Sequence, residues 1–293
     1  MPNSPFRIGL VGTGRWGQAY IRTLATLPDV TFAATYNSSF VPTDLDRDNL
    51  DGLIVATPPS SHAVLARAAL ERRIPVLIEK PMTLDLTEAR DLAEHFERAD
   101  VPAMVDHTHL FHPAYEGLKA IVGTLGGPDT VKSIRAEAGN RGPVRSDASV
   151  LWDWGAHDVA MILDLMNAKP TSVRGYSEPA GGGERVRLMF GYANGVSATI
   201  DVCNGLDRRI RSLSVDCSDK IVIYDDTVPE KLRSDSKVIS ISPDLPLTRV
   251  IFSFVESIRS GHVLRSGLDA GLSVIEVLAA CQKSIACRKT VML

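Results

Sequence analysis

Short apolar runs alternate with longer amphipathic segments in the first part of the chain. The apolar runs are rich in strand-forming residues and cover residues 6–11, 30–36, 52–56, 75–78 and 101–105. Between them, apolar residues recur at helical spacing in the segments 15–27, 61–71 and 85–99. Such an alternation is typical of parallel strands that are buried on both faces. Because parallel strands are joined by right-handed crossovers, we predict an α/β, Rossmann-type, doubly wound parallel sheet.

The pattern changes after about residue 125. Six strand-like segments with polar turns between them cover residues 130–138, 170–177, 184–192, 195–203, 208–216 and 219–224. The pair Asn194-Gly195 is typical of a tight hairpin turn. A helix is expected at residues 155–166, and helical periodicity returns from 247 to 287. This half predicts a C-terminal α+β domain with a mostly antiparallel sheet.

Composition and charge exclude several classes of protein. The chain has 293 residues, 32 of them basic and 35 acidic, and no basic block that would indicate a nucleic-acid partner. None of its four cysteines forms a CxxC pair, so neither a structural zinc nor a disulfide framework is expected. We find no signal peptide and no apolar run near the roughly 20 residues that span a bilayer, and therefore expect a cytoplasmic protein without a membrane partner.

A glycine-rich loop lies between the first predicted strand and the first predicted helix. Gly12, Gly14 and Gly17 fit the pattern G-x-G-x-x-G, in which the glycines allow a tight turn, close approach of a pyrophosphate and packing of the helix on the strand. The helix N-terminus adds free N–H groups and partial positive charge. The motif predicts an NAD or NADP site, with a ligand-free glycine turn as the alternative. The candidate cofactor-binding residues here are Gly12, Thr13, Gly14, Arg15 and Trp16.

The end of the second predicted strand bears on the choice between NAD and NADP. An acid usually stands there and binds the ribose hydroxyls, but this chain has Asn37 and Ser38 and no carboxylate. No arginine follows to hold a 2′-phosphate. Small amide and hydroxyl groups tolerate a 2′-phosphate better than an aspartate does, which favours NADP and leaves both cofactors open. Asn37 and Ser38 are added to the candidate cofactor-binding residues.

The tripeptide Glu79-Lys80-Pro81 directly follows the fourth predicted strand. The carboxyl ends of parallel strands open onto the ligand crevice, so Lys80 is a candidate catalytic residue. A desolvated lysine can act as acid or base, or polarise a hydroxyl. The alternative is a Glu-Lys surface pair.

Asp153 and His157 stand four residues apart where the helix of the second domain begins. This spacing places both on one face once the helix has begun. A histidine beside a carboxylate is suited to taking a hydroxyl proton near neutral pH. The alternative is a helix-capping Asp153 and a partly buried, structural His157.

Three histidines, His107, His109 and His112, follow the fifth predicted strand. A strand end offers no rigid i, i+4 pair, and no cysteine or carboxylate obviously completes a ligand set, so we expect no metal. We expect instead that His107 and His109 line the ligand crevice and that His112 caps the next helix.

Taken together, these segments resemble the glucose-fructose oxidoreductase / inositol dehydrogenase (Gfo/Idh/MocA) family. The similarity runs over nearly the whole chain and rests on the segments GTGRWG, ATPPSSH, EKP, DWGAH and FVESIRSG. EKP in this position is specific, whereas G-x-G-x-x-G alone is not. The resemblance implies a Rossmann domain and an α+β domain whose open sheet often forms oligomer contacts. It also implies hydride transfer between a nicotinamide cofactor and a sugar or cyclitol hydroxyl.

The resemblance assigns roles to residues at matching positions. Lys80 would lie beside the nicotinamide and polarise the substrate oxygen, His157 would accept the proton as hydride leaves, and Asp153 would position the group. The positions that match the cofactor side are Thr57, Pro58, His62, Glu79 and Lys80. The residues that would contact substrate are Lys80, His107, Arg141, Arg145, Asp153 and His157.

Residues 140–147, together with the VLWDWGAHD that follows, are most similar to the branch acting on nucleotide-linked amino sugars, such as UDP-N-acetylhexosamine 3-dehydrogenases. Arg141 and Arg145 would then bind a phosphate or carboxylate of the substrate. We expect a small carbohydrate-like substrate and a homo-oligomer, dimer or tetramer. The domains are expected at 1–123, which binds the dinucleotide, and at 124–293, which binds substrate and forms the oligomer. The last helix is expected to return to the first domain.

Two features depart from the family pattern. Only about fifteen residues, 37–51, connect the second and third predicted strands, so the usual helix there is shortened or absent. Many family members carry a second aspartate three residues after the histidine, where this chain has Ala160, while Asp158 is next to His157. Two other functions stay open: a dinucleotide-responsive regulatory protein without catalysis, and an enzyme acting on a non-sugar carbonyl such as an imine or a tetrapyrrole.

Overall fold

The computed structural model describes residues 4–37, 39–141, 148–262 and 264–293, which form two compact units. Unit 1 comprises Met1–Thr108 and Leu245–Ile275, and unit 2 comprises His109–Asp244 and Glu276–Leu293. The first change of unit therefore falls at 108–109, whereas the sequence suggested a boundary at 123–124. The returning C-terminal segment adds a whole helix and part of a second to unit 1.

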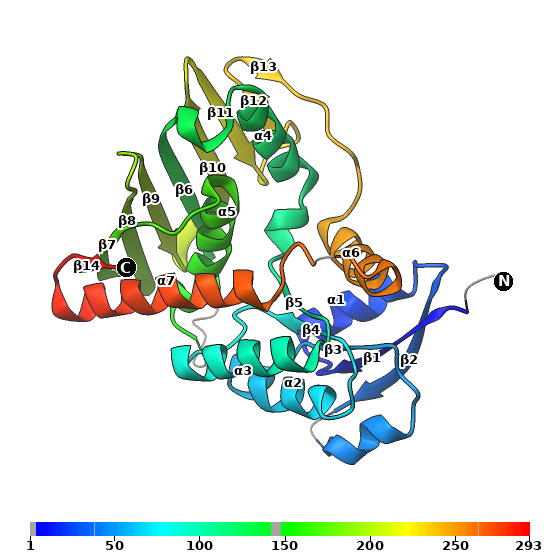
Figure 1. Cartoon of the computed structure of the whole chain (residues 1–293). Helices are drawn as coiled ribbons and strands as arrows, with labels where there is room; N and C mark the ends of the chain where they lie inside the picture. Colours follow the sequence, from blue (N-terminus) through cyan, green and yellow to red (C-terminus); the bar gives the residue numbers. More distant parts are fainter. Residues whose placement is uncertain (1–3, 38, 142–147, 263) are drawn as a thin grey trace. The chain divides into compact units, whose positions relative to one another are not determined.

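Unit 1 is built on a five-stranded parallel sheet in the order β2-β1-β3-β4-β5 (Figure 1). Its strands are β1 (Phe6–Val11), β2 (Val30–Tyr36), β3 (Gly52–Val55), β4 (Val76–Glu79) and β5 (Ala103–Asp106). Every residue of β3, β4 and β5 is buried, as a sheet covered on both faces requires. The predicted doubly wound sheet is confirmed.

Helices cover both faces of this sheet. Figure 1 shows α2 (His62–Leu70) and α3 (Leu86–Ala99) on one face, and α1 (Arg15–Leu24) and α6 (Pro246–Ser260) on the other. Asp85 caps α3 by accepting the Glu88 N–H at 2.8 Å. Among the described residues between β2 and β3, the only helical element is a short 3-10 turn, η1 (Pro42–Asp46), which confirms the shortened connection. Two further 3-10 turns are η2 (Pro59–Ser61) and η3 (Thr108–Phe111).

Unit 2 holds a nine-stranded mixed sheet in the order β13-β12-β11-β10-β6-β9-β8-β7-β14. The strands are β6 (Val131–Arg141), β7 (Ser172–Ala180), β8 (Gly183–Gly191), β9 (Ser197–Cys203), β10 (Gly205–Cys217), β11 (Lys220–Asp225), β12 (Leu232–Ser234), β13 (Lys237–Val238) and β14 (Val291–Met292). All the pairs are antiparallel except β6 with β9, which confirms the mostly antiparallel sheet. The predicted hairpin at Asn194-Gly195 joins β8 to β9, and Gly195 has a φ of 83°.

Alternate residues of the long strands of unit 2 are buried, so one face of the sheet is packed. In β10 the buried positions include Leu213, Val215 and Cys217. The helices of this unit are α4 (Pro113–Thr124) and α5 (Ala156–Met166), with a short 3-10 turn, η4 (Gly127–Thr130), after α4. Tyr115 of α4 donates its hydroxyl hydrogen bond to the Met161 carbonyl of α5 at 2.8 Å, which ties the two helices together.

Helix α7 (Leu268–Cys287) belongs to unit 1 up to Ile275 and to unit 2 from Glu276. Its 20 residues and mean hydropathy of 1.4 reach the length and composition of a membrane span, contrary to our reading of the sequence. The helix packs within the protein, however. Val274, Val277 and Leu278 are buried, and Gln282 accepts a hydrogen bond from the Trp152 indole at 2.6 Å. These contacts hold α7 within the protein, and 39% of its apolar window is buried.

Candidate functional site

The glycine loop of unit 1 lies where the strand order of the sheet reverses. β1 is flanked by β2 and β3, so the connections after β1 and after β3 run to opposite sides. Ligands of open α/β sheets bind outside the carboxyl ends of the strands at this switch point. The loop from Gly12 to Gly17 leaves β1 there, and Ala56 follows β3 beside it, because the Ala56 N–H donates to the Val11 carbonyl at 2.9 Å.

Two glycines of the loop are required by close contacts, and the third borders open space. Gly12 has a φ of 97°, and a Cβ there would lie 2.6 Å from the Ala56 carbonyl oxygen. A Cβ on Gly17 would lie 2.1 Å from the Gly12 carbonyl oxygen, so only glycine lets α1 start this close to the strand. A Cβ on Gly14 would meet no atom within 4 Å. Gly14 therefore borders open space, as a residue approached by a ligand must.

The N-terminus of α1 is open to an anion. Gly14 is its N-cap and offers no side-chain cap, and the first turn contains no acidic residue. Uncapped N–H groups and the helix dipole favour a phosphate at this point. Thr13, Arg15 and Trp16 surround the loop, and Trp16 is 38% exposed despite its size. The loop residues therefore fit a dinucleotide pyrophosphate.

The carboxyl end of β2 presents small polar groups. Asn37 is exposed, and its Oδ1 accepts hydrogen bonds from the N–H and the hydroxyl of Ser39 at 2.9 and 2.6 Å. Tyr36 donates its hydroxyl to Asp48 at 2.6 Å, so that carboxylate is already engaged. Ser38 lies outside the described residues. The described part of this strand end thus offers an amide where a ribose-binding acid usually stands.

Lys80 follows β4 and forms a cis peptide bond with Pro81. The preceding side chain, Glu79, turns into the core and accepts the backbone N–H of Lys80 at 3.1 Å. On the other side of the turn, His62 contacts the Pro81 carbonyl through Nδ1 and the Thr57 carbonyl through Nε2, both at 2.9 Å. His62 is completely buried, so its two contacts position the Thr57 and Pro81 backbones from the interior of the protein.

Beneath Lys80 lies a buried cluster of acidic groups that the sequence did not indicate. The hydroxyl of Tyr20 on α1 reaches the carboxylates of both Glu79, at 3.2 Å, and Asp106. Thr108 donates to the other oxygen of Asp106 at 2.8 Å. Tyr20 and Asp106 have no exposed surface, and Glu79 has almost none.

Burial governs the ionisation of this cluster. Burial and then the nearby Asp106 raise the pKa of Glu79 to about 8. Burial also raises the pKa of Asp106 and, together with the two carboxylates, that of Tyr20. With a pKa of about 8, Glu79 holds a proton at neutral pH, although the charge of Lys80 opposes the rise in the pKa of both carboxyl groups.

His107 follows β5 in unit 1 and is 2% exposed. Neither ring nitrogen has a hydrogen-bond partner in the described part of the chain. Burial and then the charge of Lys80 lower the pKa of His107 to about 3, so its ring is neutral. Burying a polar ring without hydrogen-bond partners costs free energy of folding. A ligand that bonds to the ring nitrogens of His107 would offset this cost.

In unit 2, Asp153 and His157 belong to one continuous helical segment. A π-helical turn, η5 (Leu151–Gly155), leads directly into α5. The helix has therefore begun before Asp153, whose N–H donates to the Ser149 carbonyl at 2.9 Å. His157 is buried in the first turn of α5, with 8% of its surface exposed. Because π-turns occur often at functional sites, this segment is a candidate site element.

Asp158, next to His157, forms an ion pair that crosses from helix to sheet. Its Oδ1 accepts a hydrogen bond from Arg211 of β10 at 2.9 Å, and the guanidinium lies 5.4 Å from the Trp154 ring centroid. Burial raises the pKa of Asp158, and Arg211 opposes that rise. The pair anchors both ends of the turn that carries His157.

His109 of η3 packs edge-on against His157, with ring centroids 4.8 Å apart and an interplanar angle of 85°. Its Nδ1 contacts the hydroxyl of Tyr224 on β11 at 2.9 Å. Burial and then the charge of Arg211 lower the pKa of His109 well below 6.5. Burial raises the pKa of Tyr224 well above 10. Both side chains are therefore neutral.

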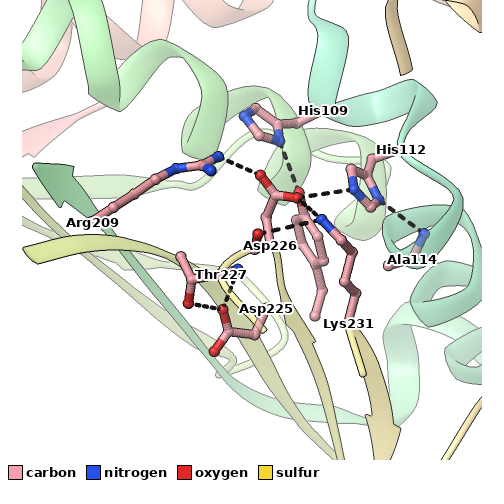
Figure 2. A network of polar contacts seen from close by, with 9 residues as sticks. His109, His112, Ala114, Arg209, Asp225, Asp226, Thr227 and Lys231 are labelled. Carbon is pink, nitrogen blue, oxygen red and sulfur yellow. Dashed lines mark hydrogen bonds and ion pairs between the residues drawn. The ribbon is translucent and has the colours of Figure 1, made fainter. Parts of the chain in front are cut away.

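Figure 2 shows the polar network around the contact between His109 and Tyr224. The carboxylate of Asp226 accepts hydrogen bonds from His112 at 3.2 Å, from Arg209 at 2.5 Å and from Lys231. Although burial alone would raise it, His112 and Lys231 lower the pKa of Asp226. As predicted, His112 caps the next helix, since its Nδ1 accepts the Ala114 N–H at 3.0 Å.

The two arginines expected to bind an anion are only partly described. Arg141 ends β6 with 79% of its side chain exposed, and it lies 3.7 Å from Asp207. Arg145 lies outside the described residues. His109 and His112 bind different partners, and among the described residues no group of three or more His, Cys, Asp or Glu side chains could hold a metal ion.

Some of the missed residues carried a usable signal. Asp106 directly ends an apolar strand, where parallel strands present functional groups. Arg211 lies an even number of residues from the buried apolar residues of β10. Because side chains alternate along a strand, this spacing places its charge on the packed face of the sheet. Tyr20 carried no such signal, because it lies in the apolar stripe of α1 and its hydroxyl partners come from distant strands.

The fold and the glycine loop are those of a dinucleotide-binding protein, and comparison with known proteins identifies the family. The family described as an oxidoreductase family with an NAD-binding Rossmann fold (GFO_IDH_MocA) matches residues 6–107. A solved structure from Magnetospirillum magnetotacticum MS-1, described as a candidate oxidoreductase, is 36% identical with a TM-score of 0.87. That match covers 95% of this chain and 100% of the other. The chain belongs to the Gfo/Idh/MocA family of oxidoreductases.

Two curated relatives indicate the range of chemistry in the family. The UDP-N-acetylglucosamine 3-dehydrogenase of Acidithiobacillus ferrooxidans is 26% identical over 181 residues, which cover 57% of this chain and 56% of that protein. The scyllo-inositol 2-dehydrogenase (NAD(+)) of Bacillus subtilis is 28% identical over 136 residues, covering 45% of this chain and 40% of that protein. The aligned regions thus span about half the length of these relatives.

Proposed function

We propose that this protein transfers a hydride between NAD or NADP and a hydroxyl-bearing carbon of a small, carbohydrate-like molecule. The observation that carries the proposal is the open space at Gly14 together with Lys80, which follows a strand on the same carboxyl edge of the sheet. The names of both curated relatives, which are dehydrogenases of a nucleotide-linked sugar and of an inositol, support it.

The cofactor would be held by residues of unit 1. In this proposal the N–H groups at the start of α1 bind the pyrophosphate, and Thr57 and Pro58 line the carboxyl end of β3. When bound, the nicotinamide accepts or supplies the hydride. His62 and Glu79 act through the backbone they support, because both are buried. The further cofactor-binding residues proposed are Gly12, Thr13, Arg15, Trp16, Asn37, Ser38 and Lys80.

The proton is handled by Lys80 and His157 in this proposal. Lys80 polarises the substrate oxygen, and His157 takes its proton as the hydride leaves carbon. Asp153, one helical turn before His157, positions the reacting group. His107 binds substrate through the ring nitrogens that find no partner among the described residues.

Two finer assignments are part of the proposal. The amide of Asn37 in place of an acid favours NADP. Arg141 and Arg145 would bind the phosphate of a nucleotide-linked sugar, and the high exposure of Arg141 leaves it accessible to such a group. We also propose that the protein works as a homo-oligomer, as the resemblance to the family implies.

The test is an absorbance assay of NAD(P)H with each cofactor and a panel that includes scyllo-inositol, myo-inositol and UDP-N-acetylglucosamine. We expect Lys80→Met to lower kcat by about 10²–10⁴-fold, the range of general acid–base catalysis, while the protein still binds the cofactor through the glycine loop. Lys132→Met, at an exposed position of β6, is the control. Cofactor binding without turnover of any compound would overturn the proposal in favour of a regulatory role.

A further inference from the structure

His109 and His157 form a pair of histidines within unit 2. Their rings are in edge-to-face contact, with centroids 4.8 Å apart. A group that reaches the His157 ring is therefore also within reach of His109. Of the two, only His157 is assigned a role in the proposed function.

The hydrogen bond between His109 and Tyr224 determines which nitrogen of His109 carries the proton. Tyr224 is completely buried, and its phenol must donate its proton to an acceptor. Among the described residues its hydroxyl contacts only Nδ1 of His109, at 2.9 Å. Nδ1 is therefore the acceptor, and a neutral ring then carries its proton on Nε2.

The surroundings keep this arrangement in place. The ring of His112 packs on the Tyr224 ring at 4.9 Å, and Asp226 holds His112. Arg211 is buried nearby and lowers the pKa of His109, which disfavours a second proton. No described residue hydrogen bonds Nε2 of His109. This nitrogen is thus an N–H donor for which the described part of the chain supplies no acceptor.

We propose that His109 is a substrate-binding residue whose Nε2–H donates a hydrogen bond to a substrate oxygen next to the one that His157 deprotonates. The ligand class is a vicinal diol or hydroxy-ketone, because a fixed N–H donor recognises an oxygen acceptor. This inference rests on the proposed function and extends it, since it selects for substrates with an oxygen beside the reacting carbon. His109 then donates a hydrogen bond to the substrate, and His157 accepts its proton.

The first test reads the tautomer directly. In the protein labelled with ¹⁵N-histidine, which contains seven histidines, His109→Gln identifies the signals of His109. We expect the Nε2–H tautomer, and a mixture of tautomers in Tyr224→Phe. Tyr192→Phe is the matched control, because that buried hydroxyl has no hydrogen-bond partner among the described residues. An Nδ1–H tautomer in the unmodified protein would overturn the proposal.

The second test reads substrate contact without turnover. Scyllo-inositol or UDP-N-acetylglucosamine is added together with reduced cofactor, a combination that cannot react. We expect the His109 Nε2–H signal to shift with at least one of them. If it moves with neither, the role of His109 is refuted, whatever the absorbance assay shows. The proposed function is judged separately, by NAD(P)H turnover alone.

The third test is kinetic and uses whichever of the two compounds is turned over, beside its analogue without a hydroxyl next to the oxidised carbon. The double variant His109→Leu/Tyr224→Phe removes both hydrogen-bond partners together, so no buried group is left unsatisfied. We expect it to lower kcat/KM about tenfold for the full substrate, the size of one neutral hydrogen bond. For the analogue, kcat/KM of the double variant should equal that of the unmodified protein. For the full substrate, His109→Gln keeps a donor, so its kcat/KM should stay within about threefold of the unmodified value. Equal losses on substrate and analogue would show a merely structural role.

Discussion

Arg211 and Asp158 form an ion pair at 2.9 Å in which 3% of the arginine side chain and none of the aspartate side chain is exposed. The arginine comes from β10, and the aspartate immediately follows His157 on α5. Ala160 stands where many family members carry an aspartate, whereas Asp158, two residues before it, has a buried partner and anchors the start of α5.

The first prediction concerns this pair. Arg211→Leu should lower the free energy of unfolding by about 3–5 kcal/mol, because it leaves a buried carboxylate uncompensated. Urea unfolding followed by circular dichroism measures the change. Adding Asp158→Leu should recover most of the loss, because no buried charge then remains. The exposed pair Arg135–Glu137 is the control, and Arg135→Leu should cost about 1 kcal/mol or less.

A second prediction separates ligand binding from folding within the glycine loop. Gly14→Ala should leave Tm unchanged, because the added Cβ meets no atom of the protein. It should raise the Kd of NADH and NADPH about tenfold or more, because the methyl group occupies space needed by the pyrophosphate. Gly17→Ala should lower stability by about 1–3 kcal/mol, since its Cβ would lie 2.1 Å from the Gly12 oxygen. Differential scanning fluorimetry and fluorescence titration measure the two effects, and unchanged affinity in Gly14→Ala would refute the assigned pyrophosphate site.

His107 should make the protein less stable in acid. Its pKa falls from 6.5 to about 3 on folding, so below pH 6.5 the unfolded chain takes up a proton that the native state does not. Stability is fully present above pH 6.5 and declines as the pH falls toward 3, with a contribution of up to about 1.4 kcal/mol per pH unit. His107→Leu should remove this part of the slope between pH 6.5 and 4.5, measured by urea unfolding. Parallel slopes in the two proteins would contradict the prediction.

The buried carboxyl pair predicts the opposite behaviour in base. Glu79 has a pKa of about 8 in the folded chain and an ordinary value of 4.5, so the native state holds a proton that the unfolded state has lost. Stability should therefore decline as the pH rises from 4.5 through 8. Asp106→Asn removes the neighbouring carboxylate but keeps an oxygen for Tyr20, and it should flatten this decline between pH 6 and 9. Asp129→Asn, at an exposed position, should leave it unchanged.

The sequence by itself determined the type of sheet in each unit. Apolar runs of strand length predicted the parallel sheet, and Asn194-Gly195 marked the hairpin, because these signals depend on neighbours along the chain. The glycine pattern likewise identified Gly12 and Gly17, where a Cβ would clash with backbone oxygens, and Gly14, which borders open space. Lys80 and His157 became candidate site residues because their motifs are local and specific to a family.

Only the tertiary structure decided which polar groups meet. Tyr20, Glu79 and Asp106 come from one helix and two strands, and no local pattern joins them. The same holds for His109 with Tyr224, which are 115 residues apart. Burial sets the ionisation of these groups and the tautomer of His109, and burial follows from how the strands and helices pack. The sequence thus determines where the strands, turns and motifs lie, whereas the packing determines which side chains carry protons.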